Sequence, residues 1–364
     1  MNLFPPDYFA ARAAFLDAAA NAGARREARA IKARGPGGEE LTIDTAWLGA
    51  AAPKRQLVIS SGTHGVEGPA GTAAQVQFLR EDWPAYRLPD DAAVLLIHAN
   101  NPFGYAWRRR MNEDNVDLNR NFLDWGNEQP PRRPEYAGIV DLLNPKEFSE
   151  ASNAAFLQAA MKLVAEKGEP WVQARLTEGQ YDFPGGLYFG GAGPVESNTV
   201  LRSIFTEALR HADEALVIDV HTGMGAYGDH LLISSHERQD PAHQWLCQHF
   251  APARVEAVMS GDTRWPAVSG KMGTAIAKAN PHCALRWFSL EFGTFEGARM
   301  ILGERAENWL FHHGDRDSVQ GKAILGEVWE CSSPTDESWR RRVLNGCRSV
   351  VLDGWRGLFG AAGF

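Results

Sequence analysis

Apolar and polar positions divide this chain into runs that predict a central sheet. The run Ala92–His98 is apolar throughout, which is typical of a strand buried on both faces of a parallel sheet, and Ala215–His221 has the same character. Leu57–Ser60 and Leu285–Phe292 are two further apolar runs that predict strands. Two other strands are predicted at Glu40–Leu48, which alternates in part, and at Leu231–Ser235.

Segments with apolar residues at helical spacing separate these strands. Because strands and helices alternate, we predict an α/β protein with a mainly parallel or mixed central sheet and helices on both faces. We see no internal repeat or linker, so we expect one catalytic domain over residues 1–364. The predicted helices are Asp7–Ile31, Ala70–Arg80, Glu147–Lys167, Asn198–His211, Ala298–His312 and Glu337–Leu358.

Two long irregular segments interrupt this alternation. Asn100–Phe122 is polar, basic and rich in turn residues, so we expect it to lie outside the core. Gln180–Pro194 combines glycines and prolines with aromatic residues that include Tyr188. That composition predicts a shaped loop at the active site over residues 180–194.

The composition then narrows the class of protein. The chain has 364 residues, of which 44% are hydrophobic, and a net charge of -8 with no long basic run, so nucleic acid and anionic membranes are poor partners. No apolar stretch approaches the ~20 residues of a membrane span, and the N-terminus does not resemble a signal peptide. The four cysteines show no Cys-x-x-Cys spacing. We therefore expect a cytoplasmic protein. The sequence is also compatible with a homo-oligomer.

Candidate chemistry begins with the turn after the Leu57–Ser60 strand. His64 and Glu67 stand two residues apart in a glycine-rich sequence, and zinc accepts nitrogen and oxygen ligands at about 2.0–2.2 Å. This pair alone is a weak signal, since a surface histidine and a helix-start glutamate would look the same. Ligands in open α/β sheets bind outside the carboxyl ends of strands, where His221 and Glu291 also lie. His64, His221 and Glu67 would supply the two histidines and the glutamate of a three-ligand catalytic zinc site. Glu291 could then take a proton from water.

The segment Arg108–Phe122 carries further candidate groups. A guanidinium beside a side-chain amide, as in Asn119-Arg120, is suited to bind a substrate carboxylate. A second arginine could polarise a carbonyl group. A basic loop in water would be the simpler interpretation if the segment stood alone.

The four motifs in this order resemble the zinc carboxypeptidase superfamily, which includes the succinylglutamate desuccinylase and aspartoacylase deacylases. The motifs are Gly-Thr-His-Gly-Val-Glu-Gly, Asn-Val-Asp-Leu-Asn-Arg-Asn-Phe, Asp-Val-His-Thr-Gly and Leu-Glu-Phe-Gly-Thr. The residues of these motifs most resemble those of a bacterial subfamily catalogued as a domain of unknown function. The resemblance covers residues 55 to 300 and implies a zinc-carboxypeptidase-like, phosphorylase/hydrolase-like fold.

The resemblance also implies functions for individual residues. Zinc, one ion per chain, would be bound by His64, Glu67 and His221, and Glu291 would be the general base and then the proton donor to the leaving amine. Asp117 would orient His64. Asn119 and Arg120 would bind the substrate carboxylate, and Arg109 or Arg110 would polarise the carbonyl, a choice that three consecutive arginines leave open. Apart from the resemblance, Tyr188 of segment 180–194 is a further candidate substrate-binding residue.

Two departures from the family pattern leave the substrate undefined. Carboxypeptidases close a tyrosine over the substrate about two dozen residues before the catalytic glutamate, but no tyrosine follows Tyr227 here. The corresponding region holds Trp265 and the run Ser269–Gly273. Aspartoacylase-type deacylases usually add a C-terminal β domain, whereas residues 336–358 predict a helix.

The sequence therefore favours a zinc hydrolase of an amide bond next to a free carboxylate. The substrate would be a short peptide or an N-acyl amino acid, and cobalt or manganese would fit similar ligands. A non-catalytic metal- or ligand-binding protein is the alternative. A dinucleotide site at Gly223–Gly228 is discounted because strand-like residues follow it rather than a helix.

Overall fold

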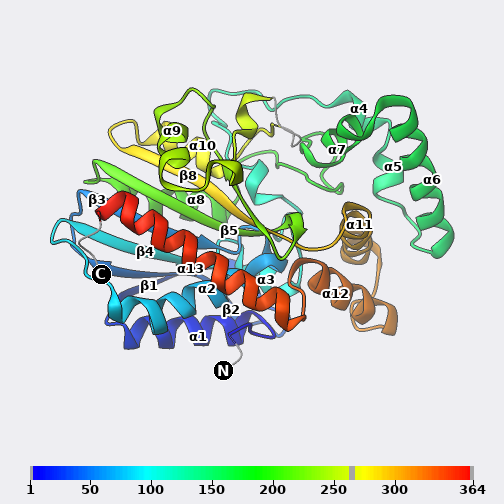
Figure 1. Ribbon diagram of the computed structural model, residues 1–364. Coiled ribbons are helices and arrows are strands. Elements are labelled where there is room, and N and C mark those ends of the chain that lie inside the picture. Colours follow the sequence, from blue (N-terminus) through cyan, green and yellow to red (C-terminus); the bar gives the residue numbers. More distant parts are fainter. Residues whose placement is uncertain (1–2, 262–266, 361–364) are drawn as a thin grey trace.

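A single mixed sheet of eight strands forms the centre of the molecule (Figure 1). The computed structural model describes residues 3–261 and 267–360. In spatial order the strands are β1-β2-β4-β3-β5-β8-β6-β7. Their bounds are β1 Arg25–Arg34, β2 Glu40–Gly49, β3 Arg55–Ser61, β4 Ala92–His98, β5 Glu214–Tyr227, β6 His230–Ser234, β7 Val255–Glu256 and β8 Ala284–Gly293.

The four central strands, β4, β3, β5 and β8, run parallel to one another. These are the four apolar runs of the sequence. β3, β4 and β8 are buried along nearly their whole length, and β5 is buried over Ala215–Thr222. Antiparallel pairing with β2 on one side and β6 on the other makes the sheet mixed. The predicted α/β class, with a mainly parallel or mixed sheet, is confirmed.

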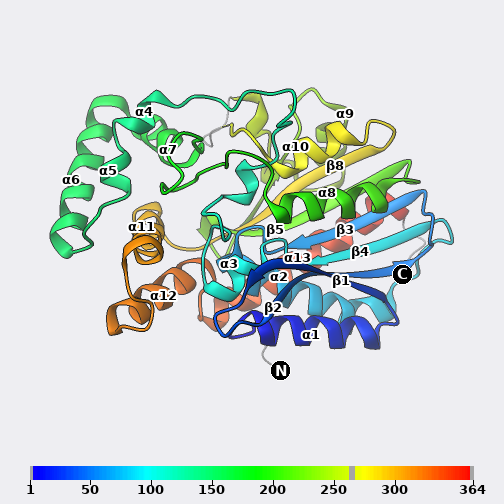
Figure 2. The ribbon, with the colours of Figure 1, turned by 180° about the vertical axis from the view of Figure 1, so that it is seen from behind.

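Helices cover both faces of this sheet. Residues of α1, α2 and α13 form one large core with one face of the strands, whereas residues of α8 and α10 pack on the opposite face. Figure 1 shows α13 in front of the sheet, and the reverse view in Figure 2 shows α8 there. The bounds of the helices in these two layers are α1 Tyr8–Asn21, α2 Gly68–Gln77, α8 Glu196–Leu209, α10 Met272–Ala279 and α13 Glu337–Phe359.

A group of mainly helical elements lies beside the carboxyl ends of the central strands (Figure 1). It packs its own small apolar cluster, which includes Tyr136, Phe156 and Tyr188. The remaining helices are α3 Pro102–Trp107, α4 Pro134–Ala137, α5 Val140–Leu143, α6 Glu150–Lys167, α7 Glu169–Thr177, α9 Pro241–His249, α11 Gly297–His313 and α12 Val319–Ser332. The C-terminal segment is a helix, as the sequence predicts, since α13 spans Glu337–Phe359.

The single helix predicted over Asp7–Ile31 is wrong in its second half. α1 ends at Asn21, Gly23 adopts a left-handed φ of +73°, and the chain then enters β1. β1 is an edge strand whose residues are mostly exposed and charged. Its sequence lacks the continuous apolar run that identifies the inner strands, which are buried on both faces.

The expectation that Asn100–Phe122 lies outside the core is also wrong. Many of its polar side chains are fully buried, among them Asn101, Asn112 and Asn121. They bond to backbone groups: Asn112 Oδ1 accepts from Val116 N at 2.8 Å, and Asn121 Nδ2 donates to Gly190 O at 2.9 Å. Buried polar groups are tolerated when they are hydrogen-bonded in this way, so composition alone misplaced the segment.

Candidate metal centre

The turn that carries His64 and Glu67 is fixed by close backbone packing. β3 ends at Ser61, and a single 3₁₀ turn, Gly65–Glu67, leads into α2. Gly65 lies against α3 so closely that a Cβ there would stand 1.9 Å from Gly104 C. Only glycine fits at this position. The contact therefore holds the turn, with His64 and Glu67, at the carboxyl end of β3.

His64, Glu67 and His221 meet in one buried cluster. Their candidate ligand atoms all lie within 4.8 Å of one another. His64 Nδ1 is 2.7 Å from Glu67 Oε1, and His221 Nδ1 is 2.9 Å from Glu67 Oε2. The side chains come from the turn after β3 and from β5, two neighbouring parallel strands. Two imidazole nitrogens and a carboxylate are the donor set of a catalytic zinc site, so these residues fit the metal that the sequence predicts.

The far nitrogen of each histidine lies against a carboxylate. His64 Nε2 is 3.2 Å from Asp117 Oδ1, and His221 Nε2 is 2.7 Å from Asp219 Oδ2. Thr63 Oγ1 in turn donates to Asp219 at 3.1 Å. Outer carboxylates of this kind fix the orientation of metal-binding imidazoles. Sequence analysis missed Asp219, although residues two apart on a strand share a face and Asp219 precedes His221 by two.

The electrostatics of the cluster reflect its burial. Burial opposes the charge of Glu67, but the two histidines facing it hold its pKa well below the usual value. Burial also lowers the pKa of His221, yet Asp219 and Glu67 outweigh that effect and raise it well above normal. His64 behaves similarly: burial and Arg110 lower its pKa, while Glu67 and Asp117 bring it above normal. His221 therefore faces negative charge on both sides, whereas His64 faces Glu67 on one side and both Asp117 and Arg110 on the other. The carboxylates around the cluster also favour a bound cation.

Of the three consecutive arginines, the structure brings Arg110 to the cluster. Its Nη1 is 3.4 Å from Glu67 Oε1, and its Nε donates to Asp117 at 3.1 Å. Arg109 points elsewhere and forms a buried ion pair with Glu307 at 2.6 Å. Arg108 lies over the ring of Trp329. Of the two arginines between which the sequence left the choice open, Arg110 therefore lies at the cluster, whereas Arg109 has its own partners away from it.

Glu291 lies beside His221 on the adjacent strand. The register of β8 against β5 pairs His221 with Glu291 directly. Glu291 is buried, and its Oε2 has no hydrogen-bond partner in the described part of the chain. Burial raises the pKa of this carboxyl group, His221 opposes that rise, and Glu67 adds to it. A carboxylate with a free oxygen and a raised pKa is suited to accept a proton.

Asn119 and Arg120 stand in a short 3₁₀ turn, Leu118–Arg120, near the cluster. Asn119 Oδ1 accepts a hydrogen bond from Met272 N at 3.1 Å, which leaves its NH₂ group to donate elsewhere. Arg120 donates to Asn119 O at 3.0 Å and to Thr177 O at 2.7 Å. Its Nε is buried, and the described residues offer it no hydrogen bond. Both side chains thus keep free donors.

The segment 180–194 packs against this turn. Tyr181 donates to Arg120 O at 2.7 Å. Tyr188 adopts a positive φ of 55°, donates its hydroxyl to Glu304, and has Arg110 over its ring at 5.3 Å. Burial, with Glu304, raises the pKa of Tyr188 well above its usual value. Tyr188 therefore touches the arginine of the cluster, but its hydroxyl is engaged.

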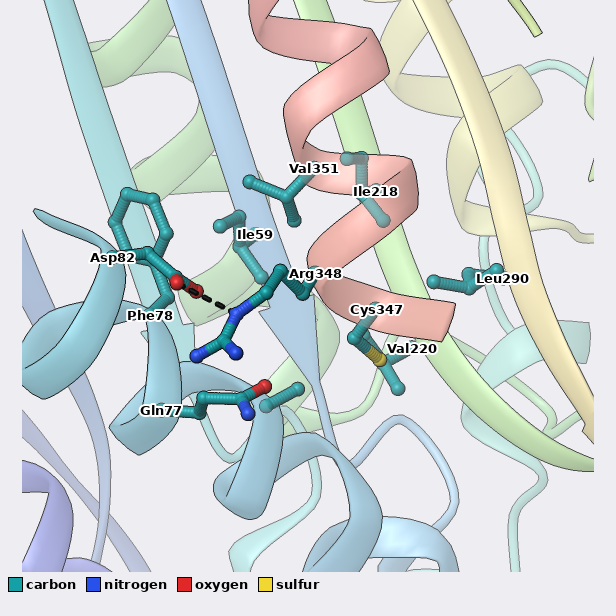
Figure 3. A pocket seen from close by; sticks show the side chains of 11 residues that line it. Ile59, Gln77, Phe78, Asp82, Ile218, Val220, Leu290, Cys347, Arg348 and Val351 are labelled. Atoms are coloured by element: carbon teal, nitrogen blue, oxygen red, sulfur yellow. Dashed lines mark ion pairs between the residues drawn. The ribbon is translucent and has the colours of Figure 1, made fainter. Parts of the chain in front are cut away.

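Two other features lie away from the cluster. His98, at the end of β4, is fully buried beside Thr72 and stacks on Phe15, and burial lowers its pKa to about 3. Figure 3 shows a small pocket beneath α13, crossed by the ion pair of Asp82 with Arg348 at 2.7 Å. None of the cluster residues lines that pocket. Trp265 lies outside the described residues.

The geometry defines a buried cluster of histidine and carboxylate side chains at the carboxyl edge of an α/β sheet. The chain belongs to the family described as "Protein of unknown function (DUF2817)", whose model matches residues 4–346. The family of unknown function that the sequence resemblance indicated is therefore confirmed. No curated protein matches the chain.

Several solved structures match most of the chain at low identity. Carboxypeptidase A from Helicoverpa armigera is 13% identical with a TM-score of 0.46, and the match covers 95% of this chain and 74% of that one. A putative metallopeptidase from Shewanella amazonensis is 13% identical with a TM-score of 0.46, covering 97% and 94%. The succinylglutamate desuccinylase from Chromobacterium violaceum is 15% identical with a TM-score of 0.37, covering 88% and 74%.

Proposed function

We propose that this protein is a zinc-dependent hydrolase of an amide bond adjacent to a free carboxylate. The observation that carries the proposal is the cluster of His64, Glu67 and His221, with Glu291 paired to His221 across two strands. The substrate is a short peptide or an N-acyl amino acid. One zinc ion per chain is expected at the cluster.

The proposed mechanism divides the work among the residues around the cluster. Bound zinc would supply Lewis acidity to water and to the substrate carbonyl. Glu291 accepts the proton of the attacking water at its free oxygen and returns it to the leaving amine. Arg110 stabilises the charge that develops on the carbonyl oxygen, as donors in an oxyanion site do.

The substrate carboxylate has a separate binding site in this proposal. Asn119 offers the NH₂ group that its bond from Met272 N leaves free, and Arg120 offers the donors that do not contact backbone carbonyls. Segment 180–194 is the active-site loop, with Tyr188 in the wall beside Arg110. A carboxylate bound here would orient the amide bond before hydrolysis.

The remaining expectations concern the setting of the enzyme. We still predict a single catalytic domain over residues 1–364 and a cytoplasmic location. A homo-oligomer is compatible with this proposal. In the described part of the chain, no helix combines the length and apolar character needed to cross a bilayer.

A non-catalytic metal- or ligand-binding protein is the alternative function. It would need the cluster but not a proton acceptor. A buried carboxylate without a partner is costly, so Glu291 argues against this alternative.

The proposal is tested by the metal content of the purified protein, measured by plasma mass spectrometry. About one zinc per chain is expected in wild type, and none in His221→Ala. His313→Ala, which removes an exposed histidine, is the matched control and should keep the metal. Circular dichroism of each variant checks folding.

A screen of N-acyl amino acids and dipeptides follows the metal measurement. Hydrolysis by wild type and its loss in His221→Ala would support the enzyme. Protein that takes up no metal even after zinc is added would refute the proposal. Bound zinc with no hydrolysis across the screen would favour the non-catalytic alternative.

A further inference from the structure

Lys271 is a buried lysine near the candidate site that neither the sequence motifs nor the proposed mechanism uses. It stands immediately before α10, and only 6% of it is exposed. Within the described chain its ammonium group has no hydrogen bond and no ion pair. An ammonium group carries three donors, and burial without acceptors is unfavourable. Such a group calls for a partner that the described residues do not supply.

Close packing brings Lys271 to the turn that holds Asn119 and Arg120. Phe122 N donates to Gly270 O at 3.0 Å, and Met272 N donates to Asn119 Oδ1 at 3.1 Å. Gly270 has a φ of +71°, and a Cβ there would stand 2.0 Å from Arg120 O. The residues on both sides of Lys271 thus contact the turn directly.

The charges around Lys271 identify this place as part of the site. Burial first, and then Arg120, lower the pKa of Lys271 to about 8, while Glu291 and Asp219 act in the opposite direction. Asp219 is already bonded to His221 and Thr63. Lys271 is therefore within electrostatic range of Arg120 and of Glu291, and it forms no ion pair with Glu291 in the described chain.

Arg120 alone does not saturate a carboxylate. Two of its N–H donors already bond backbone carbonyls of Asn119 and Thr177. An ionised carboxylate has two oxygens with roughly four acceptor positions. A second donor on the other side of the carboxylate can therefore bond without displacing Arg120.

We propose that Lys271 binds the free carboxylate of the substrate together with Arg120, and so determines specificity for an anionic end group. The inference rests on the proposed function for the identity of the ligand as a substrate. The binding itself requires only a carboxylate compound.

The test compares butyrate with butyramide, which have the same carbon chain but differ in charge. Ligand-observed NMR measures binding to the metal-loaded protein and again after metal removal, because millimolar affinities are accessible to it. Wild type should bind butyrate more tightly than butyramide. Lys271→Met should weaken butyrate about 10-fold or more, as expected for a hydrogen bond to a charged group, and leave butyramide unchanged.

Two variants control this comparison. Lys278→Met makes the same chemical change seven residues along the chain, within α10, at an exposed residue paired with Glu128. This variant should bind butyrate as wild type does. Lys271→Arg keeps the charge and should retain most of the affinity. Thermal unfolding adds a further check: Lys271→Met should be at least as stable as wild type, since it removes an unpaired buried charge.

The outcomes separate this inference from the proposed function. Butyrate binding that depends on Lys271 in a protein that hydrolyses nothing would keep the inference and reject the hydrolase. Equal binding of butyrate by wild type and Lys271→Met would overturn the inference and leave the hydrolase intact. Binding that disappears with the metal and ignores Lys271 would place the carboxylate on the metal, and would also overturn it.

With a substrate from the screen, kinetics supply a second readout. Lys271→Met should raise KM for the carboxylate substrate with little change in kcat. A fall in kcat with a shifted pH profile and an unchanged KM would mean that Lys271 acts on Glu291 instead, and the inference would be wrong.

Discussion

Two buried groups of charged side chains lie next to each other in this protein, joined by the consecutive residues Arg109 and Arg110. One is the ion pair of Arg109 with Glu307, whose side chains are 0% and 3% exposed. The other is the cluster of His64, Glu67 and His221 with its surroundings. The three candidate ligands are at most 4% exposed, so burial does not distinguish them from the ion pair.

The difference between the two lies in how completely their groups are paired. Arg109 donates to Glu307, to Asn112 O and to Asn115 Oδ1, and it stacks 3.3 Å from the ring centre of Phe311. Around the metal cluster, by contrast, Glu291 Oε2 and Arg120 Nε have no hydrogen bond in the described chain. A saturated charge cluster stabilises the fold, whereas an unsaturated one leaves groups that a ligand can satisfy.

The change with the largest expected effect is Glu291→Gln, which alters the unsaturated cluster at its proton acceptor. Glutamine keeps the size of the side chain but accepts no proton, so kcat should fall by about 10²–10⁴. Zinc content should stay near that of wild type, because Glu291 is not a ligand in the proposal. The unfolding temperature should be at least that of wild type, because the change removes an unpaired buried charge. Steady-state kinetics and metal analysis check this, and retention of full activity would refute the function assigned to Glu291.

The second change is Glu307→Gln, which breaks the saturated cluster. It leaves Arg109 buried without a counter-charge and should lower the free energy of unfolding by roughly 3–5 kcal/mol. Urea denaturation measures that loss, while kcat below the unfolding range should be unchanged. The double variant Arg109→Met with Glu307→Gln is the control and should recover part of the stability. A variant as stable as wild type but catalytically impaired would contradict the distinction between the two clusters.

Burial on both faces explains which parts of the fold the sequence predicts well. The inner strands are predicted because their residues are buried on both faces, and the strand-end positions of His64, His221 and Glu291 follow from those strands. The edge strand β1 is missed because its mostly exposed and charged residues form no continuous apolar run. Gly223–Gly228 is rightly discounted, since most of it continues β5.

Other features of the site depend on pairing that the sequence cannot reveal. Three consecutive arginines look alike, and only the fold shows that Arg109 meets Glu307, 198 residues away. Lys271 likewise lies in a glycine-rich run, and its burial depends on packing against a distant turn. Asp219 could have been inferred from its shared strand face with His221.

A smaller effect is expected from Asp219→Asn, which weakens the outer support of His221. The variant keeps all three candidate ligands but replaces the carboxylate facing His221 Nε2. Loss of such a partner typically reduces metal affinity about 10–100-fold. Competition with a zinc chelator measures the dissociation constant. An unchanged affinity would mean that Asp219 does not orient the ligand.

The smallest effect is expected where an ion pair is solvated, and it completes the comparison. Lys54 and Asp213 lie 3.4 Å apart with side chains 58% and 70% exposed. Water screens both charges, so Lys54→Met should change the free energy of unfolding by less than about 1 kcal/mol. The carbonyl of Lys54, which accepts from Asp213 N and Glu214 N, is retained in the variant. Urea denaturation beside Glu307→Gln checks the ranking. If Lys54→Met lost as much stability as Glu307→Gln, an exposed ion pair would contribute as much as a buried one. Burial would then not explain why the two ion pairs are expected to differ.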